Sequence, residues 1–154
     1  MMLVNNKNYM IDGTDIEWND TTEFTFPITG GRVIKVYDGD TITIASQLPY
    51  KDSPLYRFSV RLNRIDTPEI KSINKDEKTA AIDCRDKLSS LILNKYISLQ
   101  NIQNEKYGRI LADIYLRDIC INDLLINERY AVTYDGKEKK PPSSWLKYRI
   151  SGEL

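Results

Sequence analysis

Three short segments of the sequence carry side chains that could together hydrolyse a phosphodiester bond. They are residues 37–41 (YDGDT), 61–69 (RLNRIDTPE) and 106–109 (KYGR). This hydrolysis needs a cation near the phosphate, a group that activates water, and donors for the charge that develops in the transition state. Carboxylates could bind the cation and activate water, and guanidinium groups could act as the donors.

Two aspartates are the candidate metal ligands. Asp40 and Asp66, with a nearby backbone carbonyl such as that of Thr67, would form a site made only of oxygen atoms. Hard cations such as calcium prefer oxygen ligands. The sequence therefore favours Ca2+ as the cofactor.

Three further residues could act on water and phosphate. Glu69 follows Asp66 by three positions and is placed by Pro68, so it could take a proton from water or hold that water in line. Arg61 and Arg109 could each bind a phosphate through a guanidinium fork. We interpret Glu69, Arg61 and Arg109 as candidate catalytic residues.

The absence of histidine narrows the chemistry. The sequence has no histidine, which excludes a Ser-His-Asp triad, a paired-histidine ribonuclease mechanism and a histidine-metal nuclease site. Any hydrolysis must depend on carboxylates, arginines and a metal.

Each motif also has an ordinary structural interpretation. Asp38-Gly39 is a common hairpin turn, and Asp40 or Asp66 could cap turns. Residues 106–109 could be a hairpin loop whose glycine has a positive φ, and Arg61 could be a surface residue on a strand. Taken singly, these interpretations are preferable. Taken together, they require three unrelated coincidences.

Composition indicates a soluble globular protein, and the lack of a recognisable signal peptide or membrane segment leads us to expect an intracellular one. The chain is 41% hydrophobic and 29% charged, and 154 residues suit one domain. Its apolar runs are far shorter than the ~20 residues that cross a bilayer, so no membrane partner is expected. Residues 1–4 are too few for the apolar part of a signal peptide. We expect a monomer, with Cys84 and Cys120 as reduced, buried thiols.

Charge is divided unevenly along the chain. Residues 1–30 hold one lysine and five acidic residues, a net charge of −4, and because the whole chain is neutral the remainder is at +4. A mildly basic body is compatible with a polyanionic partner, and equally with a solvated surface of mixed charge.

The elements that would position these residues are mostly strands. Alternation of apolar and polar residues predicts strands over residues 33–37, 41–44, 57–63, 96–102 and 110–116. Helices are expected from about Asn74 to Asn94, with Glu77 completing a capping box, and over residues 122–128. Residues 22–28 alternate in a way that a strand could use. Residues 137–144 have the composition of a loop.

This order of elements predicts an α+β fold that is mainly β, a five-stranded OB-fold β-barrel capped by helices. We expect residues 1–20 to be an N-terminal extension and residues 21–154 to be a single domain.

The three motifs together resemble the signature of the staphylococcal nuclease (thermonuclease) family, which runs D-G-D-T, R-x4-D-T-P-E and K-Y-G-R. The resemblance covers about residues 32–134. It implies an OB-fold nuclease in which Ca2+ is held by Asp40, Asp66 and the carbonyl of Thr67, and Asp38 lies behind these ligands. Glu69 would be the general base, and Arg61 and Arg109 would bind the phosphate. Substrate contacts are expected from the third motif, at Lys106 and Tyr107.

The resemblance also implies a substrate and a product. Family members cleave single- and double-stranded DNA and RNA with little sequence preference and leave 3′-phosphate ends. The alternative is a non-catalytic nuclease-like OB module that binds nucleic acid or protein. Such modules typically lack the metal carboxylates or the arginines, and all five positions are filled here, so the enzyme is favoured.

Two departures from the family pattern carry structural expectations. The long final helix of the family is not expected, because residues 137–144 are polar and include two prolines. Arg129 stands where family members often have glycine after the second helix, so we expect that helix to be capped differently.

Overall fold

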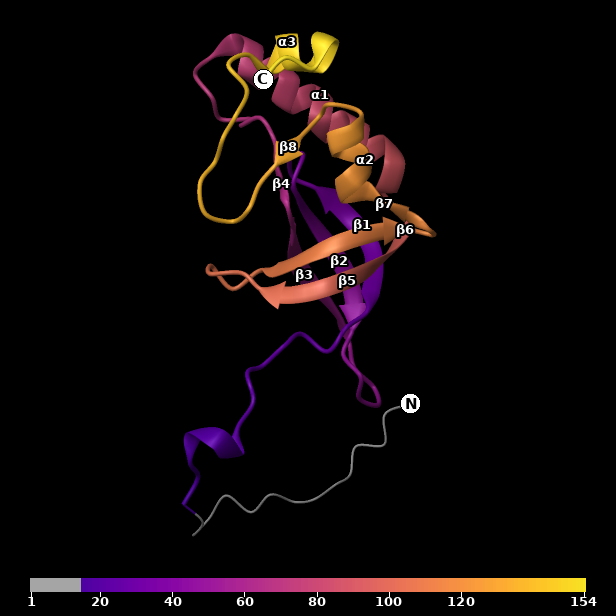
Figure 1. The fold of residues 1–154 in the computed structure, drawn as a ribbon. Helices are drawn as coiled ribbons and strands as arrows, with labels where there is room; N and C mark the ends of the chain where they lie inside the picture. The colour runs from indigo at the N-terminus through magenta and orange to yellow at the C-terminus, as the bar shows by residue number, and fades with distance from the viewer. Residues whose placement is uncertain (1–14) are drawn as a thin grey trace.

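The structure is a computed structural model that describes residues 15–154 (Figure 1). Residues 1–14, most of the expected N-terminal extension, lie outside the described part. The strands are β1 (Gly30–Val36), β2 (Thr41–Gln47), β3 (Leu55–Leu62), β4 (Ile65–Asp66), β5 (Tyr96–Asn104), β6 (Ile110–Leu116), β7 (Ile119–Cys120) and β8 (Val132–Thr133). The helices are α1 (Lys75–Ile92), α2 (Ile121–Asn127), α3 (Trp145–Ser151) and a 3-10 turn, η1 (Trp18–Asp20).

Five strands close into a barrel. β1 pairs with β2 and β5, β2 with β3, and β5 with β6, all antiparallel. A parallel pairing of β3 with β6 closes the ring. This confirms the predicted OB-fold barrel and its α+β class. β7 adds a short strand beside β6.

β3 alternates buried and exposed residues, as the sequence predicted. On β3, Val60 and Leu62 are fully buried, whereas Arg57 and Ser59 are exposed. The two faces of a strand alternate residue by residue, so Arg61 lies on the face away from the core. That placement directs a guanidinium group to the rim of the barrel.

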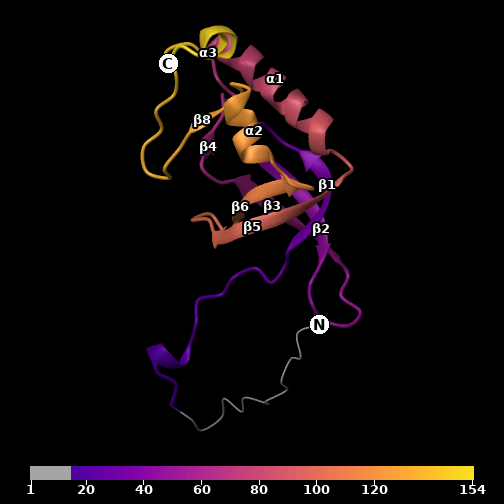
Figure 2. The ribbon, with the colours of Figure 1, turned by 45° about the vertical axis from the view of Figure 1, so that its right-hand side comes forward.

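Helix α1 covers one end of the barrel, as both ribbon views show (Figures 1 and 2). The Asn74 side chain accepts hydrogen bonds from the backbone N–H groups of Asp76 and Glu77, both at 3.0 Å, which confirms the predicted N-cap. The capping-box prediction is wrong, because the Glu77 carboxylate accepts instead from the backbone N–H of Glu69 at 3.4 Å. This contact ties the backbone of Glu69, the candidate general base, to the first turn of α1.

The C-terminal end of α2 differs from the prediction. Arg129 itself adopts the left-handed conformation, with φ 63°. Its N–H donates to the Ile126 carbonyl at 2.9 Å, and the Tyr130 N–H donates to the Leu125 carbonyl at 2.8 Å, which is the Schellman pattern. The cap therefore has the geometry that glycine usually provides, and the expectation of a different cap is wrong.

The last helix and residues 22–28 can also be compared with their predictions. α3 has seven residues, so the expected absence of a long final helix is confirmed. No strand forms over residues 22–28, which the structure describes as extended chain. Pro27 has no N–H to donate and the segment has no pairing partner, yet Phe26 and Ile28 pack against the core.

Two smaller observations complete the comparison. Cys84 and Cys120 are free, but only Cys84 is buried, and Cys120 is half-exposed. Within residues 15–154, no helix combines the length and the apolar character needed to cross a bilayer.

Candidate active site at the barrel rim

The turn before β2 is held in place by close packing. Gly39 is buried, and a Cβ at this position would lie 2.3 Å from the Cys84 Sγ and 3.1 Å from the Thr67 side chain. Glycine is therefore required here by its close approach to α1 and Thr67, and not by a positive φ, which Gly39 does not have. The approach brings the turn carrying Asp40 against the segment that carries Thr67.

Asp40 is the point where the first two motifs meet. Its Oδ2 accepts a hydrogen bond from the Thr67 hydroxyl at 3.0 Å and lies 3.2 Å from the Arg61 Nη2. Its Oδ1 accepts from the Thr41 hydroxyl at 3.1 Å. The Leu62 N–H donates to the Asp40 carbonyl at 2.8 Å, so the turn is also fastened to the end of β3.

Arg61 is oriented from both sides. Its side chain is only 12% exposed, and besides the Asp40 carboxylate it donates to the Ile65 carbonyl at 3.0 Å and to the Leu62 carbonyl. A guanidinium group held in this way has few alternative rotamers. Arg61 also lines the groove described below.

Asp66 is a buried carboxylate beside Asp40. Its side chain is 5% exposed, and its Oδ1 makes no hydrogen bond, the nearest cation being the Lys139 Nζ at 3.4 Å. Burial raises the pKa of Asp66, the charge of Asp40 raises it further, and Lys139 and Arg61 lower it. A buried carboxylate oxygen without a hydrogen bond is suited to a bound cation.

Asp38 lies behind the Asp40 backbone. Its Oδ1 accepts from the Asp40 N–H at 3.0 Å. Burial, followed by the charge of Asp40, raises the pKa of Asp38 to about 7. This carboxyl group therefore exchanges its proton near neutral pH.

Glu69 is the most exposed of the candidate carboxylates, with 61% of its side chain open to solvent. Its Oε1 accepts from the Lys139 ammonium at 3.1 Å. Since that ammonium also contacts Asp66, the base candidate and a metal-ligand candidate share one lysine.

Arg109 reaches the site from the β5–β6 hairpin. Its guanidinium pairs with Glu105, at 2.9 and 3.3 Å. Hydrogen bonding to Glu105 raises the pKa of Arg109, and the same pair lowers the pKa of Glu105. The sequence analysis did not single out Glu105, although it immediately precedes the third motif.

A groove of about 440 Å³ runs past both arginines. Its lining comes from the end of β3, the β5–β6 hairpin and the segment after β8, and includes Arg61, Arg64, Asn104, Glu105, Lys106, Tyr107, Arg109, Tyr134 and Lys139. Five of these residues are basic and one is acidic, so the groove favours an anionic occupant. Lys106 lies over the Tyr107 ring, 4.9 Å from its centroid.

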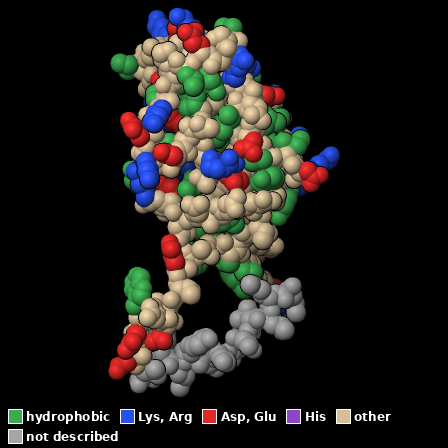
Figure 3. Space-filling view, viewed as in Figure 1, with side chains coloured by type: hydrophobic (Ala, Val, Ile, Leu, Met, Phe, Trp, Pro, Cys, Tyr) green, Lys and Arg blue, Asp and Glu red, His purple; other side chains and the backbone are tan. Residues whose placement is uncertain are grey.

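Charges of both signs are mixed on one face of the molecule. Lys and Arg side chains lie among Asp and Glu side chains across the face seen in Figure 3. The segment below the barrel shows acidic side chains, in agreement with the acidic residues Glu17 and Asp20 of its sequence. Basic side chains therefore do not dominate the face seen in Figure 3.

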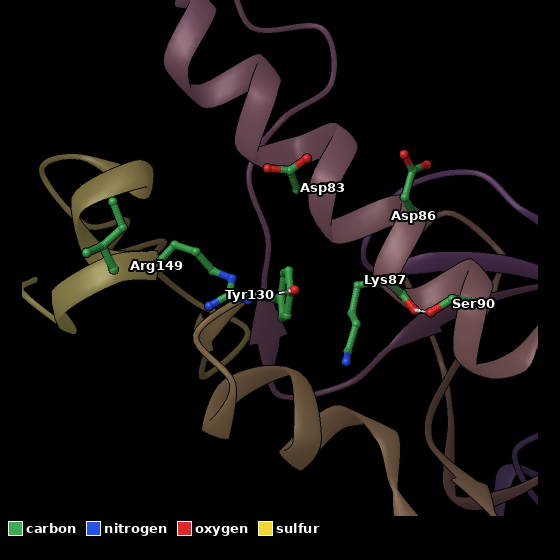
Figure 4. A pocket seen from close by; sticks show the side chains of 7 residues that line it. Asp83, Asp86, Lys87, Ser90, Tyr130 and Arg149 are labelled. Atoms are coloured by element: carbon green, nitrogen blue, oxygen red, sulfur yellow. Dashed lines mark hydrogen bonds between the residues drawn. The ribbon is translucent and has the colours of Figure 1, made fainter.

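A larger hollow of about 700 Å³ lies between α1 and α3 (Figure 4). Its cations already have partners: Lys87 pairs with Glu128 at 3.1 Å, and Arg149 stacks on the Tyr130 ring and donates to its hydroxyl at 2.7 Å. Asp83 and Asp86 add negative charge to its lining. None of the predicted site residues lines this hollow, so we place the candidate site at the groove.

The predicted metal ligands supply only part of a calcium coordination shell. Among residues 15–154, no three or more Asp, Glu or Cys side chains form a cluster that could hold a metal ion. The predicted set has only two carboxylates and one carbonyl, and calcium takes 6–8 oxygen ligands. Water or phosphate oxygens would have to complete the shell. The buried Oδ1 of Asp66 and the oxygen-only donors fit such a cation.

Fold and site together define a class: an OB-fold barrel with aspartates and arginines gathered at one rim beside a basic groove. The family described as staphylococcal nuclease homologue matches residues 59–148, more than half of the chain. The chain belongs to this family. The match includes Arg61, Asp66, Glu69 and Arg109, and the structure adds Asp40 to them through its contact with Arg61.

Two relatives agree with this assignment. A protein of Escherichia coli named "Uncharacterized endonuclease" is 30% identical over 112 residues, which is 72% of this chain and 65% of the relative. A protein of the same name from Escherichia coli O157:H7 is 29% identical over the same shares. The match thus spans a little under two thirds of the relatives' length.

Proposed function

We propose that this protein is a metal-dependent nuclease that hydrolyses DNA or RNA. The proposal depends on one observation, the joining of Asp40 to Arg61 and Thr67 beside the buried Asp66. This cluster brings acidic oxygens and an oriented guanidinium group to one end of a basic groove. Family membership supports the same assignment.

Calcium is the proposed cofactor, held by Asp40, Asp66 and the carbonyl of Thr67. When bound, such a cation neutralises phosphate charge and lowers the pKa of bound water. Asp38 hydrogen-bonds the Asp40 backbone and so fixes the direction of that carboxylate. The side chains of the protein perform the other steps.

Glu69 takes the proton from the attacking water, and its exposure leaves its carboxylate accessible to solvent. Arg61 and Arg109 bind the phosphate oxygens and stabilise the charge of the transition state. Lys106 and Tyr107, at the tip of the β5–β6 hairpin, contact the nucleic acid strand next to the scissile bond. The expected product carries a 3′-phosphate.

The substrate is proposed to be bound mainly through its backbone. Basic residues in the groove attract phosphate without reading a base sequence. We therefore expect little sequence preference and an affinity that falls with salt.

The experiment is a digestion of plasmid DNA, single-stranded DNA and RNA with Ca2+, with Mg2+ or with a chelator. Cleavage is expected with Ca2+ and is lost with the chelator, while circular dichroism shows an unchanged fold. Glu69→Gln is expected to lower the rate by about 10²- to 10⁴-fold. Glu138→Gln, on an exposed acidic residue near the same groove, serves as the control.

Analysis of the product ends provides an independent check. A 3′-phosphate agrees with the proposed mechanism. Products that carry a 5′-phosphate, or cleavage that persists in the chelator, contradict it.

A non-catalytic binding module is the second candidate, and one observation favours it. Glu69 and Arg109 both have partners within the protein, Lys139 and Glu105. If this pairing were permanent, neither would be free for catalysis. Nucleic acid binding without cleavage in any divalent cation would identify the protein as such a module.

A further inference from the structure

Lys139 lies where the acidic residues of the proposed site need a cation. Its Nζ is 3.1 Å from the Glu69 Oε1 and 3.4 Å from the Asp66 Oδ1. The Asp66 oxygen is buried, and the longer of the two contacts is an ion pair without a well-directed hydrogen bond. One ammonium group thus spans a buried and an exposed carboxylate.

The other cations of the site are already paired. Arg61 contacts Asp40, and Arg109 contacts Glu105. In the described part of the chain, the ion pairs of Asp66 and Glu69 are both made with Lys139. A buried carboxylate without a compensating charge is costly, so this lysine stabilises the site when no metal is present.

The segment that carries Lys139 is anchored at its ends and exposed in its middle. The Tyr134 N–H donates to the Arg64 carbonyl at 2.9 Å, and Trp145 is buried at the start of α3. Between them, residues 135–141 are all exposed, and Gly136 has a φ of 85° with open space around it. Few contacts hold this middle part, so its rearrangement costs little.

We propose that Lys139 is a resident competitor of the divalent cation. It neutralises Asp66 and Glu69 in the metal-free protein and leaves Asp66 when a cation binds. This inference rests on the proposed function. Two positive charges cannot share one carboxylate oxygen without strong repulsion, so the ammonium and the metal exclude each other.

Displacement has two consequences for the site. The apparent metal affinity equals the intrinsic affinity multiplied by the fraction of molecules in which Lys139 does not occupy Asp66. Because one ammonium group contacts both carboxylates, its movement away from Asp66 also weakens its contact with Glu69, so metal binding and exposure of the proposed base are coupled. The protein then keeps its base paired until the cation is present.

The first test is calcium binding measured by isothermal titration calorimetry. Lys139→Gln is expected to bind Ca2+ about three- to tenfold more tightly than the wild type, since the competing ion pair is partly exposed and of modest strength. Lys137→Gln, on the same exposed segment, is the matched control and should stay within about twofold of the wild type. An unchanged or weaker affinity in Lys139→Gln overturns the proposal.

The second test separates displacement from simple repulsion between Lys139 and the metal. Lysine acetylation of the full chain, read by mass spectrometry, is compared with and without Ca2+, and Lys137 is the internal reference. Displacement predicts that Ca2+ increases the labelling of Lys139 and that Asp66→Asn abolishes the increase. Tighter binding in Lys139→Gln with no change in labelling would show that the lysine stays in place, and the proposal would fail.

Failure of this proposal can be distinguished from failure of the proposed function. Calcium-dependent cleavage with unchanged labelling of Lys139 contradicts only the proposal that Lys139 is displaced. Calcium binding that releases Lys139, without cleavage of any nucleic acid, supports that proposal and contradicts the proposed nuclease function. Absence of calcium binding in both the wild type and Lys139→Gln contradicts both proposals.

Discussion

Among single residues, Asp40 and Arg61 make the contacts that connect the candidate site. Asp40 contacts donors from Thr41, Arg61 and Thr67, and this makes it the centre of the cluster. The motif that contains Asp40 is, by itself, an ordinary turn sequence. The contact with Arg61 distinguishes Asp40 from a turn residue. The Arg61 guanidinium is nearly buried and donates to two backbone carbonyls as well as contacting the Asp40 carboxylate.

Arg61→Gln is expected to lower nuclease turnover about a hundred- to a thousandfold, because it removes a donor aimed at the phosphate. It should also destabilise the fold by about 3 kcal/mol, since Asp40 loses its buried partner. Urea denaturation and a cleavage assay measure the two effects. Arg57→Gln, four residues earlier on the same face of β3 but exposed, should change neither.

Asp38 should make the stability of the metal-free protein depend on pH. Its pKa is about 7 in the folded state and near 3.8 in the unfolded chain, so the folded protein binds more protons between these values. This contribution to stability is complete below about pH 4 and is lost as the pH rises through 7.

Denaturation in a chelator from pH 4 to 8 measures this effect. Asp38→Asn should lose the pH-dependent component and become more stable relative to the wild type as the pH rises. A constant difference between the two proteins across this range would show that Asp38 does not titrate as expected.

Among the elements, local sequence patterns were sufficient to predict the barrel strands and α1. Val60 and Leu62 alternate with polar residues, and Asn74 is a good N-cap, so neighbouring residues alone indicate these elements. The three motifs also indicated most of the candidate site. The alternation at residues 22–28 led to a wrong expectation of a strand, because a strand needs a pairing partner and the local sequence does not reveal one.

Other features depend on residues far apart in the chain. The β4–β8 pairing joins Asp66 to Val132, and Lys139 reaches Glu69 across 70 positions. The Glu77 carboxylate accepts from the Glu69 N–H, eight residues away, and not from the N–H of its own N-cap, which donates to Ser72. No spacing rule within one segment predicts such contacts.

The cap of α2 leads to a prediction about Arg129. Its backbone is left-handed, which favours glycine, whereas its guanidinium donates to the Ile150 carbonyl near the end of α3 at 3.0 Å. Arg129→Ala loses that bond and keeps the strained backbone, and Arg129→Gly loses the bond but relieves the strain. Arg129→Gly should therefore be more stable than Arg129→Ala by about 1 kcal/mol in urea denaturation. Equal stability would mean that the backbone is not strained.

At the scale of the whole molecule, the N-terminal segment can be divided by what it buries. η1 has no buried residue, whereas Ile28 is 5% exposed and Phe26 packs on Phe58 with ring centroids 6.0 Å apart. Residues 15–20 are exposed, whereas Phe26 and Ile28, after the expected boundary near residue 20, contact the barrel. Whether residues 21–154 form one independent domain stays a prediction.

Two truncations test that boundary. Deletion of residues 1–20 should leave the melting temperature nearly unchanged. Deletion of residues 1–28 removes core contacts worth about 2–4 kcal/mol, and should lower the melting temperature by roughly 5–15 °C. Differential scanning calorimetry compares the two. A large loss in the shorter deletion would place the boundary earlier in the chain.

The short β4–β8 pairing also bears on how the protein is made. Asp66 lies in the first half of the chain, but its strand partner and the lysine beside it come from the last quarter. A growing chain on the ribosome therefore cannot assemble this corner of the molecule until residue 139 has been made. A chain that already carries Asp66 and Glu69 therefore still lacks the strand partner and the ammonium group that contact them until residues 132–139 have been made.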